Sequence, residues 1–128
     1  MGRILFMFSL GAFFFLSSPA KSEQAKTANT PQMPATVAEG EKLFHSYCAG
    51  CHGEKAAGTT RGPSFLSPIY KPEHHGDESF VLAAMNGVRS HHWSFGDMPP
   101  VPGVSPGEVR KIVGYVRWLQ TQAWSAQP

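Results

Sequence analysis

Apolar positions recur at helical spacing in three stretches of the chain, and the first stretch begins near residue 36. Thr36 and Glu39 have the spacing of a capping box, which predicts a helix start. The apolar residues that follow fall on one helical side: Val37, Leu43, Phe44 and Tyr47. Gly40 lies on the same side, and a glycine inside a helix costs about 1 kcal/mol relative to alanine. We therefore expect another backbone to approach this helix closely at Gly40.

The other two helices carry their own start and stop signals. A helix is predicted over residues 78–86, with Asp77 as its N-cap and Gly87 just past its end. The last helix has the clearest start, because Ser105 is a predicted N-cap, Pro106 suits the first position and Glu108 completes a capping box. Its apolar positions follow at helical spacing: Val109, Ile112, Val113, Val116 and Leu119 or Gln120. Residues 121–128 are expected to fray.

Glycines and prolines punctuate residues 53–76 and 87–104, which are predicted to be loops. All three predicted elements are helices, so the predicted fold class is all-α. The expected domain covers residues 36–120.

The N-terminal part of the chain has a different composition. Residues 1–20 resemble a secretory signal peptide, with Arg3 before an apolar run and small residues before a cleavage point after Ala20. The alternative is an uncleaved anchor, although the run is short for a membrane span. Residues 21–35 are polar and lack any apolar period, which predicts a disordered linker. We therefore expect an exported, periplasmic protein with no membrane span after cleavage.

Size and charge limit the classes of function. The chain has 128 residues, of which 41% are hydrophobic and 16% charged, as expected for one compact domain. Its formal net charge of +2 is too small to indicate a nucleic-acid partner.

The chemistry of the chain centres on Cys48-Ala49-Gly50-Cys51-His52, which reads C-x-x-C-H. This is the attachment signature of a c-type haem. Two cysteine sulfurs at this spacing form thioether bonds to the two haem vinyl groups, and His52 reaches the iron. Two alternatives are a redox-active disulfide and half of a zinc site. The first normally accompanies a βαβ pattern, and the second normally needs four ligands, whereas the chain has two cysteines.

Further motifs surround this signature in a fixed order. They are Gly40-x-x-x-Phe44, Gly62-Pro63, Met98-Pro99-Pro100 and the aromatic Tyr115 in the last helix. With these motifs, residues 36–119 resemble the class I cytochrome c family. The resemblance implies a small cytochrome c fold, with three to four helices around one covalently bound haem c and its iron.

The resemblance also implies roles for individual residues. The Pro63 carbonyl would accept the Nδ1 proton of His52, and Met98 would be the second axial iron ligand. His91 and His92 are rivals to Met98, because they lie in the same predicted loop and imidazole binds iron well. Met98 is favoured because two prolines follow it and the last helix begins soon afterwards.

Two histidine pairs, His74-His75 and His91-His92, raise the question of a second metal site. Imidazole suits copper and zinc. Adjacent histidines in a loop tend to point apart, and no further ligand set is visible in the sequence. We therefore expect no second metal.

The implied function is one-electron transfer and not catalysis. Implied partners are redox proteins, a donor dehydrogenase and an acceptor oxidase or reductase, which would dock transiently over the haem edge. Two alternatives remain: a haem subunit of a larger periplasmic oxidoreductase, and a haem enzyme or sensor with a labile sixth ligand.

Overall fold

The structure is a computed structural model that describes residues 32–126. Its helical elements are α1 (Ala35–Tyr47), α2 (Ala49–His52), η1 (Glu54–Ala56), η2 (Pro68–Tyr70), α3 (Asp77–Asn86) and α4 (Pro106–Ser125). Residues 32–126 form no strand, and their one isolated β-bridge joins Val88 to Met98. The fold is therefore all-α, as predicted. The predicted signal peptide and most of the predicted linker lie outside the described residues.

Helix α1 begins one residue earlier than predicted, and the predicted capping box is wrong. Pro34 is the N-cap residue, and no side chain caps the first turn. Thr36 lies inside the helix, while the Glu39 carboxylate pairs with Lys111 Nζ on α4 at 2.7 Å. Glu39 therefore does not cap its own helix but forms an ion pair between α1 and α4.

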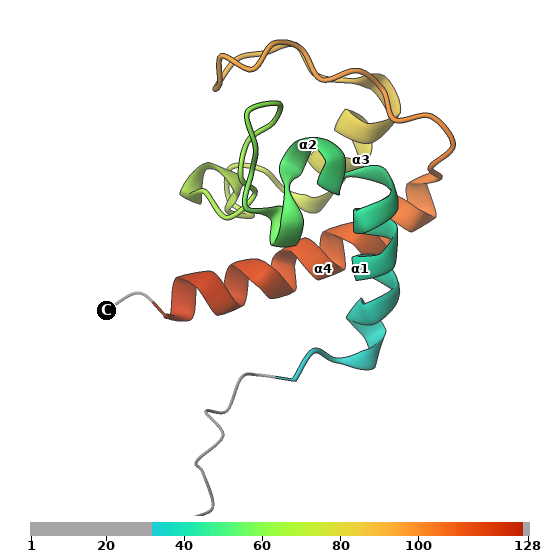
Figure 1. Cartoon of the computed structure of the whole chain (residues 1–128), viewed down its shortest axis with the longest axis vertical. Helices are drawn as coiled ribbons and strands as arrows, with labels where there is room; N and C mark the ends of the chain where they lie inside the picture. Colours follow the sequence, from blue (N-terminus) through green and yellow to red (C-terminus); the bar gives the residue numbers. More distant parts are fainter. Residues whose placement is uncertain (1–31, 127–128) are drawn as a thin grey trace, which may run out of the picture.

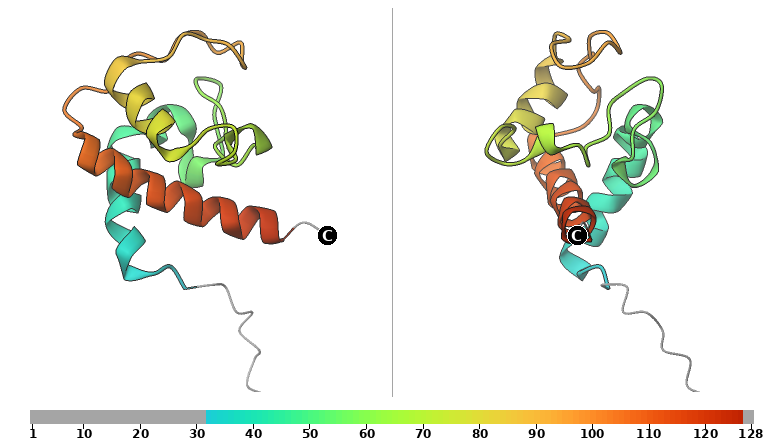
Figure 2. Two further views of the ribbon diagram at one scale, coloured as in Figure 1. Left: turned by 180° about the vertical axis from the view of Figure 1, so that it is seen from behind. Right: turned by 90° about the vertical axis from the view of Figure 1, so that its left-hand side faces the viewer.

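The two long helices cross at Gly40, where the prediction of a close backbone approach is confirmed. A Cβ atom at this position would collide with the carbonyl oxygen of Lys111. Beside the crossing, the rings of Phe44 and Tyr115 pack with their centroids 5.6 Å apart, and both side chains are buried. Figures 1 and 2 show α1 crossing the first half of α4. Glycine is required here because the backbones meet without room for a side chain.

The start of α4 is confirmed in detail. Ser105 is the N-cap, Pro106 occupies the first turn, and Ser105 and Glu108 form both halves of a capping box. Helix α3 begins one residue earlier than predicted, with Gly76 and not Asp77 as its N-cap. The Asp77 carboxylate instead accepts a hydrogen bond from Arg117 Nε at 2.8 Å.

The predicted fraying after residue 120 is wrong, because α4 continues to Ser125. Gln120 is fully buried, and its Nε2 donates to the carbonyl oxygen of Phe65 at 2.7 Å. Trp124 Nε1 donates to the carbonyl oxygen of Leu66 at 3.0 Å. The last turns of α4 therefore satisfy loop carbonyls that would otherwise lose their hydrogen bonds on burial.

The loops are arranged on one side of α4. In both views of Figure 2, the segment after α2 and the segment between α3 and α4 stand on the same side of this helix. The core lies between α1, α3 and α4, and includes Phe44, Val81, Ile112 and Val116. No helix within residues 32–126 is both long and apolar enough to cross a membrane.

Candidate haem site

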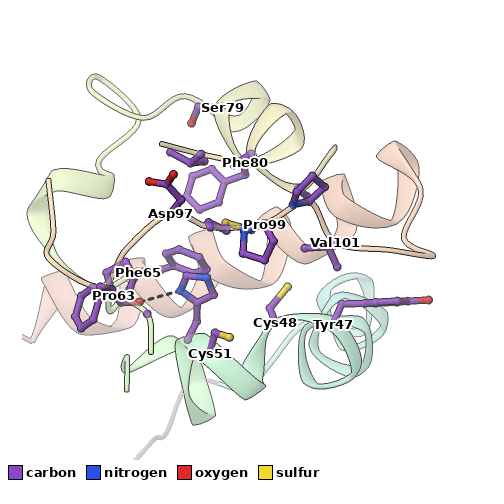
Figure 3. A pocket seen from close by; sticks show the side chains of 18 of the residues that line it. Tyr47, Cys48, Cys51, Pro63, Phe65, Ser79, Phe80, Asp97, Pro99 and Val101 are labelled. Atoms are coloured by element: carbon purple, nitrogen blue, oxygen red, sulfur yellow. Dashed lines mark hydrogen bonds between the residues drawn. The ribbon is translucent and has the colours of Figure 1, made fainter. Parts of the chain in front are cut away.

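A cavity of about 590 Å³ opens between α2 and the loop of residues 87–104. Its size falls within the range of pockets that enclose small-molecule cofactors. Its walls are mostly apolar, and they also carry the residues singled out in the sequence: Cys48, Cys51, His52, Pro63 and Met98. Figure 3 shows Cys48 and Cys51 on one side of this cavity, with Phe80 and Pro99 across from them.

The chain bends at Cys48, which ends α1 and precedes α2. Its backbone N–H donates to the carbonyl oxygen of Phe44 at 2.8 Å, while its own carbonyl accepts from Cys51 and His52 at 3.1 and 2.9 Å. Residues three apart in a helical turn share a face. Both sulfurs therefore line the same cavity, and neither cysteine forms a disulfide.

The two thiols differ in exposure. Cys51 is exposed, whereas Cys48 is half-buried. Burial, followed by the charge of a Cys51 thiolate, raises the pKa of the Cys48 thiol to about 11. The thiol form therefore dominates at neutral pH, and thiols react with disulfides and oxidants far more slowly than thiolates do.

His52 is held in one orientation by two contacts. Its Nδ1 lies 3.0 Å from the Pro63 carbonyl oxygen, the contact implied by the resemblance, which the dashed line in Figure 3 marks. The ring also stacks on Phe65 with centroids 4.0 Å apart. Because the carbonyl can only accept, Nδ1 carries the proton and Nε2 keeps its lone pair. Burial lowers the pKa of His52 and the Pro63 bond opposes this effect, so the neutral, ligating form prevails.

Contacts around the C-x-x-C-H turn include several that the sequence did not predict. Arg61 donates to the Gly50 carbonyl oxygen, and Gly58 N–H donates to the His52 carbonyl at 2.6 Å. Gly62 packs against Cys51 so closely that an added Cβ would lie 3.0 Å from the Cys51 carbonyl oxygen. The glycines and the nearby Thr59 indicate a tight loop in the sequence. Which atoms form the hydrogen bonds and close contacts, however, depends on how the loop folds back on the C-x-x-C-H turn.

Met98 is fixed by its backbone on the other side of the cavity. Met98 and Val88 exchange two backbone hydrogen bonds of 2.9 Å, which close the loop between them. Gly87 lies beside this bridge with φ of 76°, and an added Cβ there would meet the Met98 carbonyl oxygen. Val101 N–H also donates to the Ala84 carbonyl on α3 at 2.8 Å. The residues that flank Met98 are thus tied to the end of α3.

The histidine pairs do not point apart, and that expectation is wrong. His74, His75 and His92 each place a ring nitrogen within 4.8 Å of the others, and the His91 ring stacks on His75 and lies tilted against His92. Partial loss of hydration and repulsion from charges on His91, His75 and His74 lower the pKa of His92. Within residues 32–126 no other group of three metal-ligating side chains gathers in this way.

The residues on the cavity wall fit a covalently attached haem. Two free thiols and a neutral imidazole with an accessible Nε2 line the wall near α2, and a thioether lines the same cavity from the loop of residues 87–104. Thiols are the groups that add to vinyl carbons, and imidazole and thioether are both haem iron ligands. The fold and site define a small all-α domain of the kind that binds a cofactor covalently.

Comparison with known proteins assigns the family. Residues 37–120 match the family model described as Cytochrome c. Cytochrome c-551 of Bacillus subtilis is 35% identical over 65 residues, which make up 51% of this chain and 55% of that protein. The CcoP subunit of a cbb3-type cytochrome c oxidase from Rubrivivax gelatinosus is 31% identical over 104 residues, 80% of this chain and 30% of that subunit.

The chain therefore belongs to the cytochrome c family, and to its class I members with an all-α fold. Family membership implies a covalent haem c with iron and a role in electron transfer. The matched regions span about half of one relative and under a third of the other. No solved structure matches the chain significantly.

Proposed function

We propose that this protein is a periplasmic one-electron carrier with a single covalent haem c. In this proposal Cys48 and Cys51 hold the haem, His52 and Met98 are the axial ligands, and Pro63 orients His52. The observation that carries it is that all four ligating groups line one apolar cavity. A single C-x-x-C-H motif in a chain with two cysteines supports one haem.

The bound haem iron would supply the ferric–ferrous couple, and the chain sets its properties. The Pro63 carbonyl makes the His52 imidazole a better donor. The Val88–Met98 bridge closes the loop of residues 87–104, and the bond from Val101 to Ala84 ties that loop to α3, so the thioether would need little reordering to bind iron. A soft thioether raises the reduction potential, and burial of the cofactor shields it from water.

Occupied axial positions would leave no open site for oxygen or peroxide, which favours a carrier over an enzyme. Transfer of electrons between proteins suits a small, transient interface. The exposed aromatic side chains Trp93 and Phe95 lie at the cavity rim, where a donor dehydrogenase or an acceptor oxidase or reductase would approach. Residues 1–20 and their composition support export to the periplasm.

A second candidate is a haem subunit of a larger oxidoreductase. The similarity to a subunit of a cbb3-type oxidase, over 80% of this chain, favours it. Purification at native abundance separates the two: a carrier elutes as an isolated small protein, whereas a subunit elutes with its complex.

The test of the proposal begins with the purified holoprotein. Haem should stay on the polypeptide during extraction with acidic organic solvent, and replacement of both cysteines by alanine should abolish its retention. A redox titration should then show one reversible one-electron transition. Extractable haem, or stable binding of carbon monoxide to the ferrous protein without denaturant, would contradict the proposal.

A further inference from the structure

Four of the six histidines in the chain gather at one place, and three of them, His75, His91 and His92, line the haem cavity. They come from two segments that are far apart in sequence, the turn after η2 and the loop before Met98. His74 Nε2 and His92 Nε2 lie 3.3 Å apart, and one ring nitrogen of His75 lies within 4.8 Å of both. The cluster is separate from His52, which lies on α2.

The distance between His74 and His92 suits two ligands of one metal ion. Zinc–nitrogen bonds are about 2.0–2.1 Å long, so two nitrogens at a tetrahedral angle stand about 3.3 Å apart. When no metal ion is bound, one of these two nitrogens carries a proton and donates it to the other. A metal ion would replace that proton and accept both lone pairs, because histidine must be deprotonated to bind.

His75 has the tautomer that a ligand requires. Its Nδ1 donates to the Ile69 carbonyl oxygen at 2.7 Å, which leaves the Nε2 lone pair free. A ligating histidine usually donates its other ring nitrogen to a carbonyl or carboxylate in this way. The His75 backbone is also fixed, because Arg117 Nη2 donates to its carbonyl oxygen at 2.6 Å. The positive charge of Arg117 is offset by Asp77, 2.8 Å from its Nε.

We propose that His74, His75 and His92 form a binding site for one divalent copper or zinc ion at the edge of the haem cavity. Three imidazoles without a carboxylate favour these borderline metals over magnesium and calcium, which prefer oxygen ligands. Three histidines with an open fourth position are an established ligand set for zinc.

The site would connect two parts of the haem cavity. His74 and His75 belong to a turn closed by hydrogen bonds to the Lys71 carbonyl of 3.0 and 2.8 Å. His92 belongs to the loop that ends at the Val88–Met98 bridge, six residues before Met98 (98 − 92 = 6). A bound ion would therefore tie the loop that carries Met98 to the segment before α3. This inference rests on the proposed function in one respect, because His92 cannot bind this ion if it is the sixth iron ligand.

The experiment uses untagged, haem-loaded holoprotein stripped of loose metal by chelation. Zinc is titrated by calorimetry and copper by equilibrium dialysis with metal analysis. We expect one ion per protein, with copper bound more tightly than zinc. His74→Ala and His92→Ala should each weaken binding at least tenfold. His45→Ala is the matched control, because His45 is an exposed histidine on α1 outside the cluster, and it should leave the affinity unchanged.

Both variant positions are exposed, so neither substitution should disturb the fold, and an unchanged haem spectrum and circular dichroism would verify this. Failure of the wild type to bind either ion stoichiometrically would overturn the proposal. Equal loss of affinity in His45→Ala, or full affinity in both cluster variants, would also overturn it.

Discussion

The Nδ1 atom of His52 lies 3.0 Å from the carbonyl oxygen of Pro63, eleven residues further along the chain. This bond fixes which nitrogen of the His52 imidazole is free to bind metal. It also gives the ring partial anionic character, which stabilises ferric more than ferrous iron. A change in the strength of this hydrogen bond should therefore shift the reduction potential of the haem iron.

Substitution of Pro63 by glycine tests this relationship. The carbonyl remains but the loop gains freedom, so the hydrogen bond should weaken and the potential should rise. The net value of such a hydrogen bond, about 0.5–1.5 kcal/mol, sets an upper limit of about 20–60 mV for the rise, which is reached only if the bond stabilises the ferric state alone. Pro72→Gly, at an exposed position in another turn, is the control. The Pro72→Gly control should leave the reduction potential unchanged. If the reduction potential of Pro63→Gly is also unchanged, or is lower than in the wild type, Pro63 does not have the assigned role.

The crossing of α1 and α4 predicts opposite effects for two glycine-to-alanine substitutions. Gly40→Ala should destabilise the holoprotein by about 1–3 kcal/mol, because the new methyl group collides with the Lys111 backbone. Gly114→Ala, inside α4 with no atom within 4 Å of the added Cβ, should stabilise it by up to about 1 kcal/mol. Urea unfolding would measure both changes in the free energy of unfolding, provided that the dependence of this free energy on urea concentration is the same in all three proteins. Equal effects of the two substitutions would show that the crossing is not tight.

The capping box of α4 should make stability depend on pH. Hydrogen bonds that Glu108 accepts from the Ser105 side chain and backbone lower the pKa of its carboxyl group. The folded protein therefore favours the carboxylate, whose stabilising contribution is present above the ordinary pKa and is lost as the pH falls through the lowered one. Glu108→Gln retains an acceptor oxygen without this titration. Its stability deficit relative to wild type, measured by urea unfolding, should shrink between pH 7 and strongly acidic pH. A deficit that is constant or grows would contradict the linkage.

Helix positions and the haem motif could be predicted because their signals are local. The Ser105–Glu108 cap and the glycine at position 40 each depend on residue type and helical spacing. The contacts that complete the site join distant residues and have no local pattern. The Val88–Met98 bridge, the approach of His74 to His92, and the bonds from Gln120 and Trp124 to loop carbonyls are of this kind.

For the same reason the end of α4 was not predicted. Polar residues such as Thr121 and Gln122 suggest a frayed tail when they are considered alone. The buried carbonyl of Phe65 gives Gln120 a partner, and such a carbonyl costs about 1–3 kcal/mol when it is left unpaired. Tertiary structure therefore extends the helix beyond its apolar pattern.

The optical spectrum of the ferric holoprotein tests most directly whether His52 and Met98 together hold the haem iron, as we propose. The comparison needs the wild type beside Met98→Ala, His91→Ala and His92→Ala. All three substituted side chains line the cavity, so each is a rival for the sixth position.

A sulfur-to-iron charge-transfer band should appear in the far red for the wild type at neutral pH. It should persist in both histidine variants and disappear only in Met98→Ala, together with a sharp fall in reduction potential. A wild type without this band, and a high-spin spectrum in one histidine variant, would instead identify that histidine as the ligand and contradict the account.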